Sequence, residues 1–207
     1  MVSSFAQVGS PEHIVARRED VGRAAFSVIA RDGFERASMR AIAAEMQCST
    51  GVLTHHFRDK RAITKYVLDR LLSDLIEWGE HPVARAMTLE RTILSLLPHD
   101  EESRAWWRVF LHFSSASIND ASLRVDEARR EAVVVDRLKD SLKREIAAGR
   151  LPKGLDVDQE AHALLPFIDG LGFHAVLDPS RYTRAMQKKL LRATIDRLAK
   201  VDVSATT

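Results

Sequence analysis

Hydrophobic residues recur every three or four positions along almost the whole chain, which is the spacing of one helix face. Almost no segment alternates polar and apolar residues as a half-buried strand would. The pattern therefore predicts an all-α protein of about nine helices. The expected helices cover about residues 11–32, 39–46, 50–57, 60–77, 88–97, 101–118, 121–148 and 156–177, with a ninth ending near residue 198.

The stretch Ser38–Phe57 contains two very short expected helices, joined only by residues 47–49. Isolated helices of fewer than ~12 residues are marginal in water, so these two must pack on each other and on a third helix. This arrangement is typical of a helix-turn-helix, whose second helix enters the DNA major groove. The apolar faces that would pack inward are Ile42, Ala43 and Met46 in the first helix, and Leu53 and Phe57 in the second.

The first expected helix would support this pair. Pro11 suits the first helical position, and Gly33 suits a left-handed stop. We expect Phe34 to fill the core between this helix and the motif. Ser38 and Ser49 are the expected N-caps of the two short helices.

A fourth helix, capped by Asp59, would connect the motif to the rest of the chain and end near Glu77, where Gly79, His81 and Pro82 follow. Asp156 and Gln159 have the spacing of a capping box at the start of the eighth helix. The expected organisation is a mobile tail over 1–10, a helix-turn-helix DNA-binding domain over 11–60, and a helical ligand-binding and dimerisation domain over 61–207.

Composition and charge narrow the class of protein. The chain has 207 residues, of which 45% are hydrophobic and 29% charged, so it can form a folded core. Its net charge of +2 is only weak support for nucleic-acid binding. Locally the signal is stronger: between residues 36 and 61 there are five Lys and Arg against two acidic residues, a net +3.

Other features point to a cytoplasmic protein. Cys48 is the single cysteine, so an internal disulfide is impossible, and at the motif's turn we interpret it as a small buried residue rather than a redox sensor. No apolar run reaches the ~18 residues of a membrane span, and no signal peptide is visible at the start.

The motif resembles that of the TetR family of bacterial one-component regulators. The resemblance rests on SMRAIAAEMQCSTGVLTHHFRDKRAI together with the preceding helix and DGF, and it covers residues 17–68. The segment AAGRLPKGLDVDQEAHALLPFIDGLGFHAVLDPSRY is similar, more loosely, to the C-terminal domain of the branch that includes the choline-responsive, BetI-like regulators. The resemblance implies a DNA-binding regulator, most commonly a repressor, that uses no catalytic residues and no cofactor.

Three motif positions depart from the family pattern. Gln47 stands where glycine is common, and Thr54 and His56 stand where tyrosines are common. Gln47 indicates either a turn that needs no left-handed residue or one that tolerates strain. The shorter Thr54 and His56 would change how the motif reaches phosphate.

Candidate DNA contacts follow from the faces of the motif and from the resemblance. If Leu53 and Phe57 point inward, Thr50, Gly51, Thr54 and His55 point outward and can meet base edges. The resemblance adds Arg40 as a base contact and Ser38, His56 and Lys60 as phosphate contacts. His55 and His56 are neighbours pointing about 100° apart on a helix, so they cannot share a metal ion, and no metal site is expected.

A short recognition helix reads few bases, so we expect a homodimer on a palindromic operator, with the two helices roughly 34 Å apart. The last two helices would pair with those of a second copy in a four-helix bundle. The alternative is that these stripes face the chain's own core. The expected interface residues are Leu164, Ile168, Gly172, Leu190, Thr194 and Leu198.

The second domain is expected to bind a small, largely apolar effector of unknown identity. Aromatic and hydroxyl side chains share one helix there, as a pocket with a few orienting polar groups would require. Plain core packing is the alternative interpretation. The expected pocket residues are Trp106, Phe110, Phe113, Ser114, Phe167 and His174.

Two other function classes are alternatives to the regulator. A helical enzyme would need a recognisable nucleophile, metal or phosphate motif, and HExxH, P-loop and GxSxG patterns are all absent from the sequence. A protein-interaction module that uses the three-helix head for protein contact is the other alternative. Sequence-selective DNA binding would separate the three.

Overall fold

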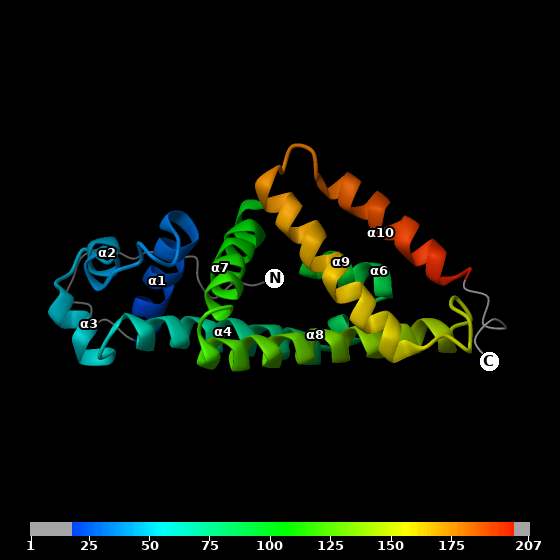
Figure 1. Ribbon diagram of the computed structural model, residues 1–207, viewed down its shortest axis with the longest axis horizontal. Coiled ribbons are helices and arrows are strands. Elements are labelled where there is room, and N and C mark those ends of the chain that lie inside the picture. The colour runs from blue at the N-terminus through cyan, green and yellow to red at the C-terminus, as the bar shows by residue number, and fades with distance from the viewer. Residues whose placement is uncertain (1–17, 201–207) are drawn as a thin grey trace.

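The computed structural model describes residues 18–200, and every regular element among them is a helix. There are ten, shown in Figure 1. They are α1 (Arg18–Asp32), α2 (Met39–Glu45), α3 (Thr50–His56), α4 (Lys60–Glu80), α5 (Pro82–Arg85), α6 (Leu89–Leu96), α7 (Glu101–Ser117), α8 (Ala121–Ala147), α9 (Val157–Leu177) and α10 (Arg184–Leu198).

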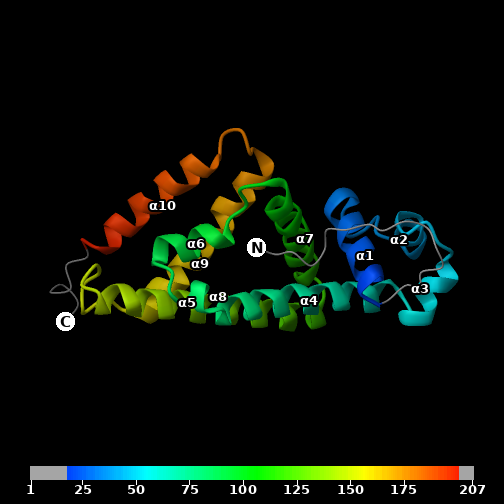
Figure 2. The same ribbon diagram turned by 180° about the vertical axis from the view of Figure 1, so that it is seen from behind.

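The molecule is elongated, with α1–α3 at one end and α8–α10 reaching the other (Figure 1). We call α1–α3 the head and the remaining helices the body. Helices α4 and α8 run side by side along the base, and α7 rises beside α1 (Figures 1 and 2). Helices α9 and α10 slope apart from the turn that joins them, and α6 packs against α10 and lies in front of α9 in the view of Figure 2.

Two main hydrophobic clusters hold these parts together. The head cluster contains the buried faces of α1, α2 and α3, and it also takes in Ile63 and Val67 of α4 and Val109 of α7. The body cluster is built mainly from α6, α8 and α9. Packing therefore continues across residue 60, where we expected the two domains to divide.

The polar ends of the helices follow local capping chemistry. Ser38 Oγ accepts from Ala41 N at 3.1 Å, and Asp59 Oδ1 accepts from Ala62 N at 2.8 Å, as predicted. Asp156 caps α9, but the complete capping box in the described chain is at Asp100 and Ser103. Ser49 occupies its expected N-cap position without a side-chain cap bond, so that part of the prediction was wrong.

The end of α4 also differs from the prediction. Helix α4 continues through Gly79 to Glu80, because an interior glycine only weakens a helix. Pro82 sets the boundary instead: the residue before proline avoids helical angles, and His81 is extended at φ −63° and ψ 135°. Pro82 then opens the one-turn α5, the additional helix beyond the nine expected.

Phe34 does not fill the core. It is half-buried at the surface and lies under the Lys60 ammonium, 4.7 Å from Nζ to the ring centroid. Ala37 and the α7 side chains occupy the head cluster where Phe34 was expected. The predicted tail and Pro11 lie outside the described residues.

Candidate DNA-binding surface

The turn between α2 and α3 contains a non-glycine residue in the left-handed region. Gln47 has φ 52°. Cys48 N donates to Ala43 O at 3.0 Å and Gln47 N donates to Ala44 O at 3.1 Å, which is the bond pattern of a Schellman motif. Glycine usually occupies this position, so of the two interpretations of Gln47 the strained turn is the correct one.

The faces of α2 and α3 are sorted as their apolar spacing predicts. Ile42, Leu53 and Phe57 are buried at 1%, 0% and 2% exposure. The five predicted base-contact residues, Arg40, Thr50, Gly51, Thr54 and His55, are all exposed. Helix α3, together with Arg40 of α2, therefore presents a polar face to solvent.

The polar face carries small groups at its centre. The Thr54 hydroxyl donates to Gly51 O at 3.0 Å, which leaves its methyl group and an oxygen lone pair outward. A Cβ built on Gly51 would meet only Ser49 Oγ, at 3.5 Å, so nothing in the described chain requires glycine there. A binding partner that approaches this backbone closely would require glycine, because a side chain would stand between the two surfaces.

The three predicted phosphate contacts have partners within the chain. Ser38 Oγ caps α2, and Lys60 Nζ donates to Glu35 O at 3.2 Å while lying over Phe34. His56 is half-buried and packs edge-to-face on His55, with centroids 4.9 Å apart. Lys60 would have to leave its carbonyl to reach a phosphate.

The positive charge of the motif region is partly neutralised. Arg58 pairs with Asp59 at 2.9 Å and Arg61 pairs with Asp120 at 3.2 Å. Among the described residues, Arg36 and Arg40 have no ion-pair partner within 4.0 Å. Both are exposed and can meet an anion, whereas Arg18, also without a carboxylate within 4.0 Å among the described residues, lies over the Phe57 and Tyr66 rings.

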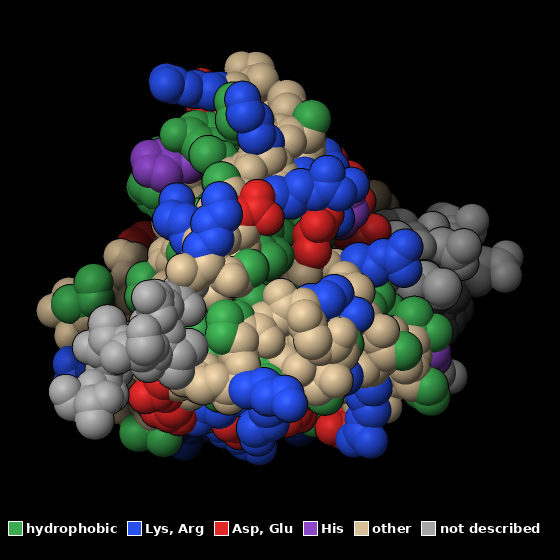
Figure 3. All heavy atoms as spheres, turned by 90° about the vertical axis from the view of Figure 1, so that its right-hand side faces the viewer, with side chains coloured by type: hydrophobic (Ala, Val, Ile, Leu, Met, Phe, Trp, Pro, Cys, Tyr) green, Lys and Arg blue, Asp and Glu red, His purple; other side chains and the backbone are tan. Residues whose placement is uncertain are grey.

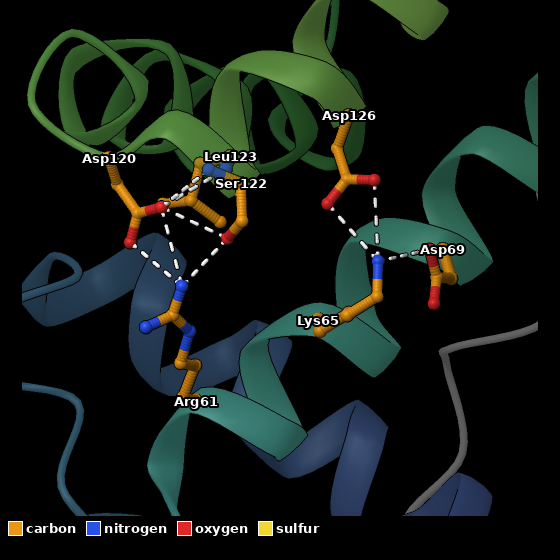
Figure 4. A network of polar contacts seen from close by, with 7 residues as sticks. All are labelled: Arg61, Lys65, Asp69, Asp120, Ser122, Leu123 and Asp126. Atoms are coloured by element: carbon orange, nitrogen blue, oxygen red, sulfur yellow. Dashed lines mark hydrogen bonds and ion pairs between the residues drawn. The ribbon is translucent and has the colours of Figure 1, made fainter.

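Two basic side chains of α4 tie its start to the start of α8 (Figure 4). Arg61 donates to Ser122 Oγ at 2.7 Å in addition to its ion pair with Asp120. One turn later, Lys65 Nζ lies 3.2 Å from Asp126 Oδ2. Sequence reasoning missed these acids, which are ordinary helix-start and surface residues until the fold places α8 beside α4.

A second connection runs through α7. Trp106 packs on Phe26 of α1, with ring centroids 5.4 Å apart, and Val109 is buried in the head cluster at 2% exposure. Helices α4 and α7 therefore both pack directly on the head.

The six predicted pocket residues are spread over several clusters. Trp106 packs on the head cluster, Phe113 belongs to a small cluster with Leu68 and Leu123, and Phe110 and Phe167 lie at the edge of the body cluster. Ser114 Oγ donates to Glu127 Oε1 at 3.2 Å, and exposed His174 stacks on Tyr182. A pocket shared by these six residues stays a prediction.

The described chain does contain a half-open cleft of about 780 Å³, between the head and the body. It lies at the end of α1, the start of α4 and the end of α7. Its lining includes charged side chains of both signs, among them Asp32, Lys60, Arg61 and Asp120, beside apolar ones such as Phe34 and Leu123.

Most predicted dimer residues are also inside the chain's own core. Leu164, Ile168 and Leu198 are 2%, 2% and 7% exposed, and Gly172 is buried against the Trp107 ring. They have little surface left for a partner, so their place in a dimer interface stays a prediction that burial within one chain does not support. Leu190 is 37% exposed and Thr194 is half-buried, which leaves both accessible.

The described residues offer little to other chemistries. Over 18–200, no group of three His, Cys, Asp or Glu could hold a metal ion. Within the same range no helix is long and apolar enough to cross a membrane.

At the end farthest from α3, lysine and arginine side chains are interspersed with acidic ones rather than gathered in one basic patch (Figure 3).

Comparisons with known proteins agree with this arrangement. The family "Bacterial regulatory proteins, tetR family" matches residues 23–67, and "BetI-type transcriptional repressor, C-terminal" matches residues 82–200, more than half of the chain. The transcriptional regulator BetI of Vibrio campbellii is 26% identical over 205 residues, which cover 92% of this chain and 94% of BetI.

Two solved structures extend the likeness to the fold. A transcriptional regulator from Rhodococcus sp. Rha1 is 25% identical with a TM-score of 0.74, covering 87% of this chain and 95% of its own. A regulator from Saccharomonospora viridis in complex with choline is 21% identical with a TM-score of 0.72, covering 86% and 95%. The matched proteins are regulators rather than enzymes, which removes the enzyme alternative. The chain belongs to the TetR family of bacterial transcriptional regulators, with a BetI-type C-terminal domain.

Proposed function

We propose that this regulator represses genes near its own by binding a palindromic operator as a homodimer, and that a small molecule releases it. The observation that carries the proposal is that α3 has one buried and one exposed face. Leu53 and Phe57 are buried, while the outward face is exposed and polar. A helix presented in this way fits the major groove.

The proposed contacts have distinct roles. Arg40 is suited to guanine, and the Thr50 and Thr54 methyl groups are suited to thymine. His55 can donate to a base edge, and Gly51 lets the helix backbone approach the DNA. Ser38, His56 and Lys60 would contact phosphates, with Lys60 exchanging its bond to the Glu35 carbonyl for one to DNA.

The proposed dimer uses a face of α9 and α10 that the chain leaves uncovered. Phe173 and Leu177 on α9 are 42% and 64% exposed, and Met186 and Leu190 on α10 are both 37% exposed. Large apolar side chains gathered on two adjacent helices are typical of a surface that a second copy covers. The small exposed Gly170 lies on the same side of α9 as Phe173 and Leu177.

The proposed release by an effector uses the two helices that join head and body. A ligand that binds one arrangement of the body more tightly than the other would shift the spacing of the two heads in the dimer. Support comes from the head contacts of α4 and α7, and from the choline complex of the S. viridis relative. In this proposal the DNA-binding part is residues 11–60 and the sensing and dimerising part is residues 61–207.

Electrophoretic mobility shift of fragments from the DNA beside the gene tests the proposal. We expect a palindromic fragment to be retarded at protein concentrations that leave a scrambled fragment free, with binding that weakens as salt rises. Equal retardation of both fragments would refute sequence-selective binding, and a protein bound as a monomer would refute the dimer.

A further inference from the structure

Two half-buried arginines of α8 have no acidic partner within 4.0 Å among the described residues. Arg137 and Arg144 are two helical turns apart and flank Ser141, which is fully buried. Arg144 Nη2 donates to Ser141 Oγ at 2.7 Å and lies 3.5 Å from Met87 O. The three side chains therefore form a polar strip on the face of α8 that meets α6.

The strip has unused donors. Arg137 Nη1 and Arg144 Nε are shielded from solvent and have no hydrogen-bond partner among the described residues. Neither arginine has a carboxylate within 4.0 Å there, in contrast to Arg130 on the same helix, which pairs with Glu127. Burial and the nearby Arg144 charge lower the pKa of Arg137. An unpaired buried cation is costly, so a partner is missing.

Nearby acids are already engaged. Glu145 accepts from Arg150 and from Leu89 N, and the bond from Leu89 is 3.1 Å long. Asp74 pairs with Arg70 at 2.8 Å. Glu145 therefore cannot turn to Arg137 without leaving Arg150 or the Leu89 amide unpaired, whereas Asp74 Oδ2 is shielded from solvent and has no partner among the described residues.

The surroundings suit a ligand with an acidic group. The Arg137 guanidinium lies beside Gly79 of α4, where a Cβ would sit 3.6 Å from its Cζ, so no α4 side chain covers it at that point. The hydroxyls of Ser141 and Thr92, 3.1 Å apart, add donors. Leu138 and Leu142 of the body cluster lie on the same helix and supply apolar surface beside the polar strip.

We propose that Arg137, Ser141 and Arg144 form a binding site for the acidic group of a small organic anion, and that the effector of this regulator belongs to that class. The effector part rests on the function proposed above. Guanidinium groups form strong, paired hydrogen bonds to carboxylate, sulfonate and phosphate groups. A quaternary ammonium such as choline would be repelled by the same two charges.

A matched pair of fluorescent probes tests the site in the absence of DNA. The anion 1-anilinonaphthalene-8-sulfonate is titrated against N-phenyl-1-naphthylamine, which has the same aromatic groups without the sulfonate. We expect Arg137→Met to weaken binding of the sulfonate by about tenfold to hundredfold and to leave the neutral probe unchanged. Arg129→Met, at an exposed position on the same helix, is the control and should match the wild type.

Thermal unfolding supplies a second readout that does not depend on the dye. Sulfate, added at constant ionic strength with chloride as the replaced ion, should raise the Tm of the wild type and of Arg129→Met. Arg137→Met should have a higher Tm than the wild type without sulfate, because it lacks the buried unpaired charge, and should not respond to sulfate.

Unchanged sulfonate binding in Arg137→Met would overturn the site, as would equal losses for both probes or a sulfate response that survives in this variant. Failure of the operator shift would leave these binding results intact and would count against the proposed function instead. If the sulfonate binds at Arg137 but does not weaken operator binding by the wild type, the effector class is wrong.

Discussion

Phe26 of α1 and Trp106 of α7 pack against each other with ring centroids 5.4 Å apart and planes tilted by 57°. The contact joins the head to the body, because Trp106 comes from a body helix and packs on the head cluster. We expect Trp106→Ala to lower the free energy of unfolding by about 2–3 kcal/mol through the cavity it leaves. Urea unfolding measures this. Trp78→Ala, outside the main clusters, is the control and should cost clearly less.

Gln47→Gly should stabilise the protein. Gln47 adopts a left-handed conformation that costs a residue with a Cβ roughly 1 kcal/mol, and glycine avoids this cost. The gain in unfolding free energy should be about 1 kcal/mol in urea titrations. Gln47→Ala keeps the Cβ and should show no comparable gain. Equal gains in both variants would mean that side-chain contacts, not the backbone, explain the effect.

Arg40→Ala and Thr54→Ala should each weaken binding to the operator by ~1–3 kcal/mol if these side chains read bases. Both positions are exposed, so the fold should be unaffected. Fluorescence anisotropy on operator and random duplexes measures the difference, with exposed Arg129→Ala of α8 as the control. The same loss on both duplexes would assign the side chain to backbone contact.

Leu177→Asp should convert the proposed dimer to monomer. Its side chain is 64% exposed at the end of α9, beside the exposed Phe173, and an unpaired charge in an interface is strongly unfavourable. Sedimentation velocity reports the change. Val125→Asp, at a 70% exposed position of α8, should leave the dimer intact. A dimer that survives Leu177→Asp and Phe173→Asp would place the interface elsewhere.

Asp169→Asn should stabilise the protein at pH 7.5 but not at pH 4. Burial raises the Asp169 pKa to about 6; Arg130 opposes the rise, and Glu127 and Glu131 add to it. An acid whose pKa is higher in the folded chain destabilises the fold once ionised, so stability is lost as pH rises through about 4 to 6.

The gain for Asp169→Asn at pH 7.5 should be about 1 kcal/mol, reduced by solvent screening because a third of the side chain is exposed. Unfolding in urea at both pH values measures it. Asp140→Asn, at an exposed position, is the control. A gain that persists unchanged at pH 4 would assign the effect to hydrogen bonding rather than to ionisation.

Local features were readable from the amino-acid sequence by itself. Helical spacing and caps such as Ser38 and Asp59 depend on residues a few positions apart, so they predicted the helices and the exposed face of α3. The helix boundary at His81–Pro82 is also set by neighbouring residues. The predicted end of α4 near Glu77 was wrong because the helix continues through Gly79 and stops only before Pro82.

Only the tertiary structure decided which partner each apolar face meets. Helix α9 is apolar around most of its circumference. The spacing of its hydrophobic residues therefore does not distinguish Leu164, which is buried, from Phe173, which is exposed. Trp106 packs on the head cluster for the same reason. The Arg137–Arg144 strip is visible only once the fold shields one nitrogen of each arginine from solvent without giving it a partner among the described residues. A sequence specifies periodicity along the chain, but the burial of a side chain depends on residues brought near it from distant positions.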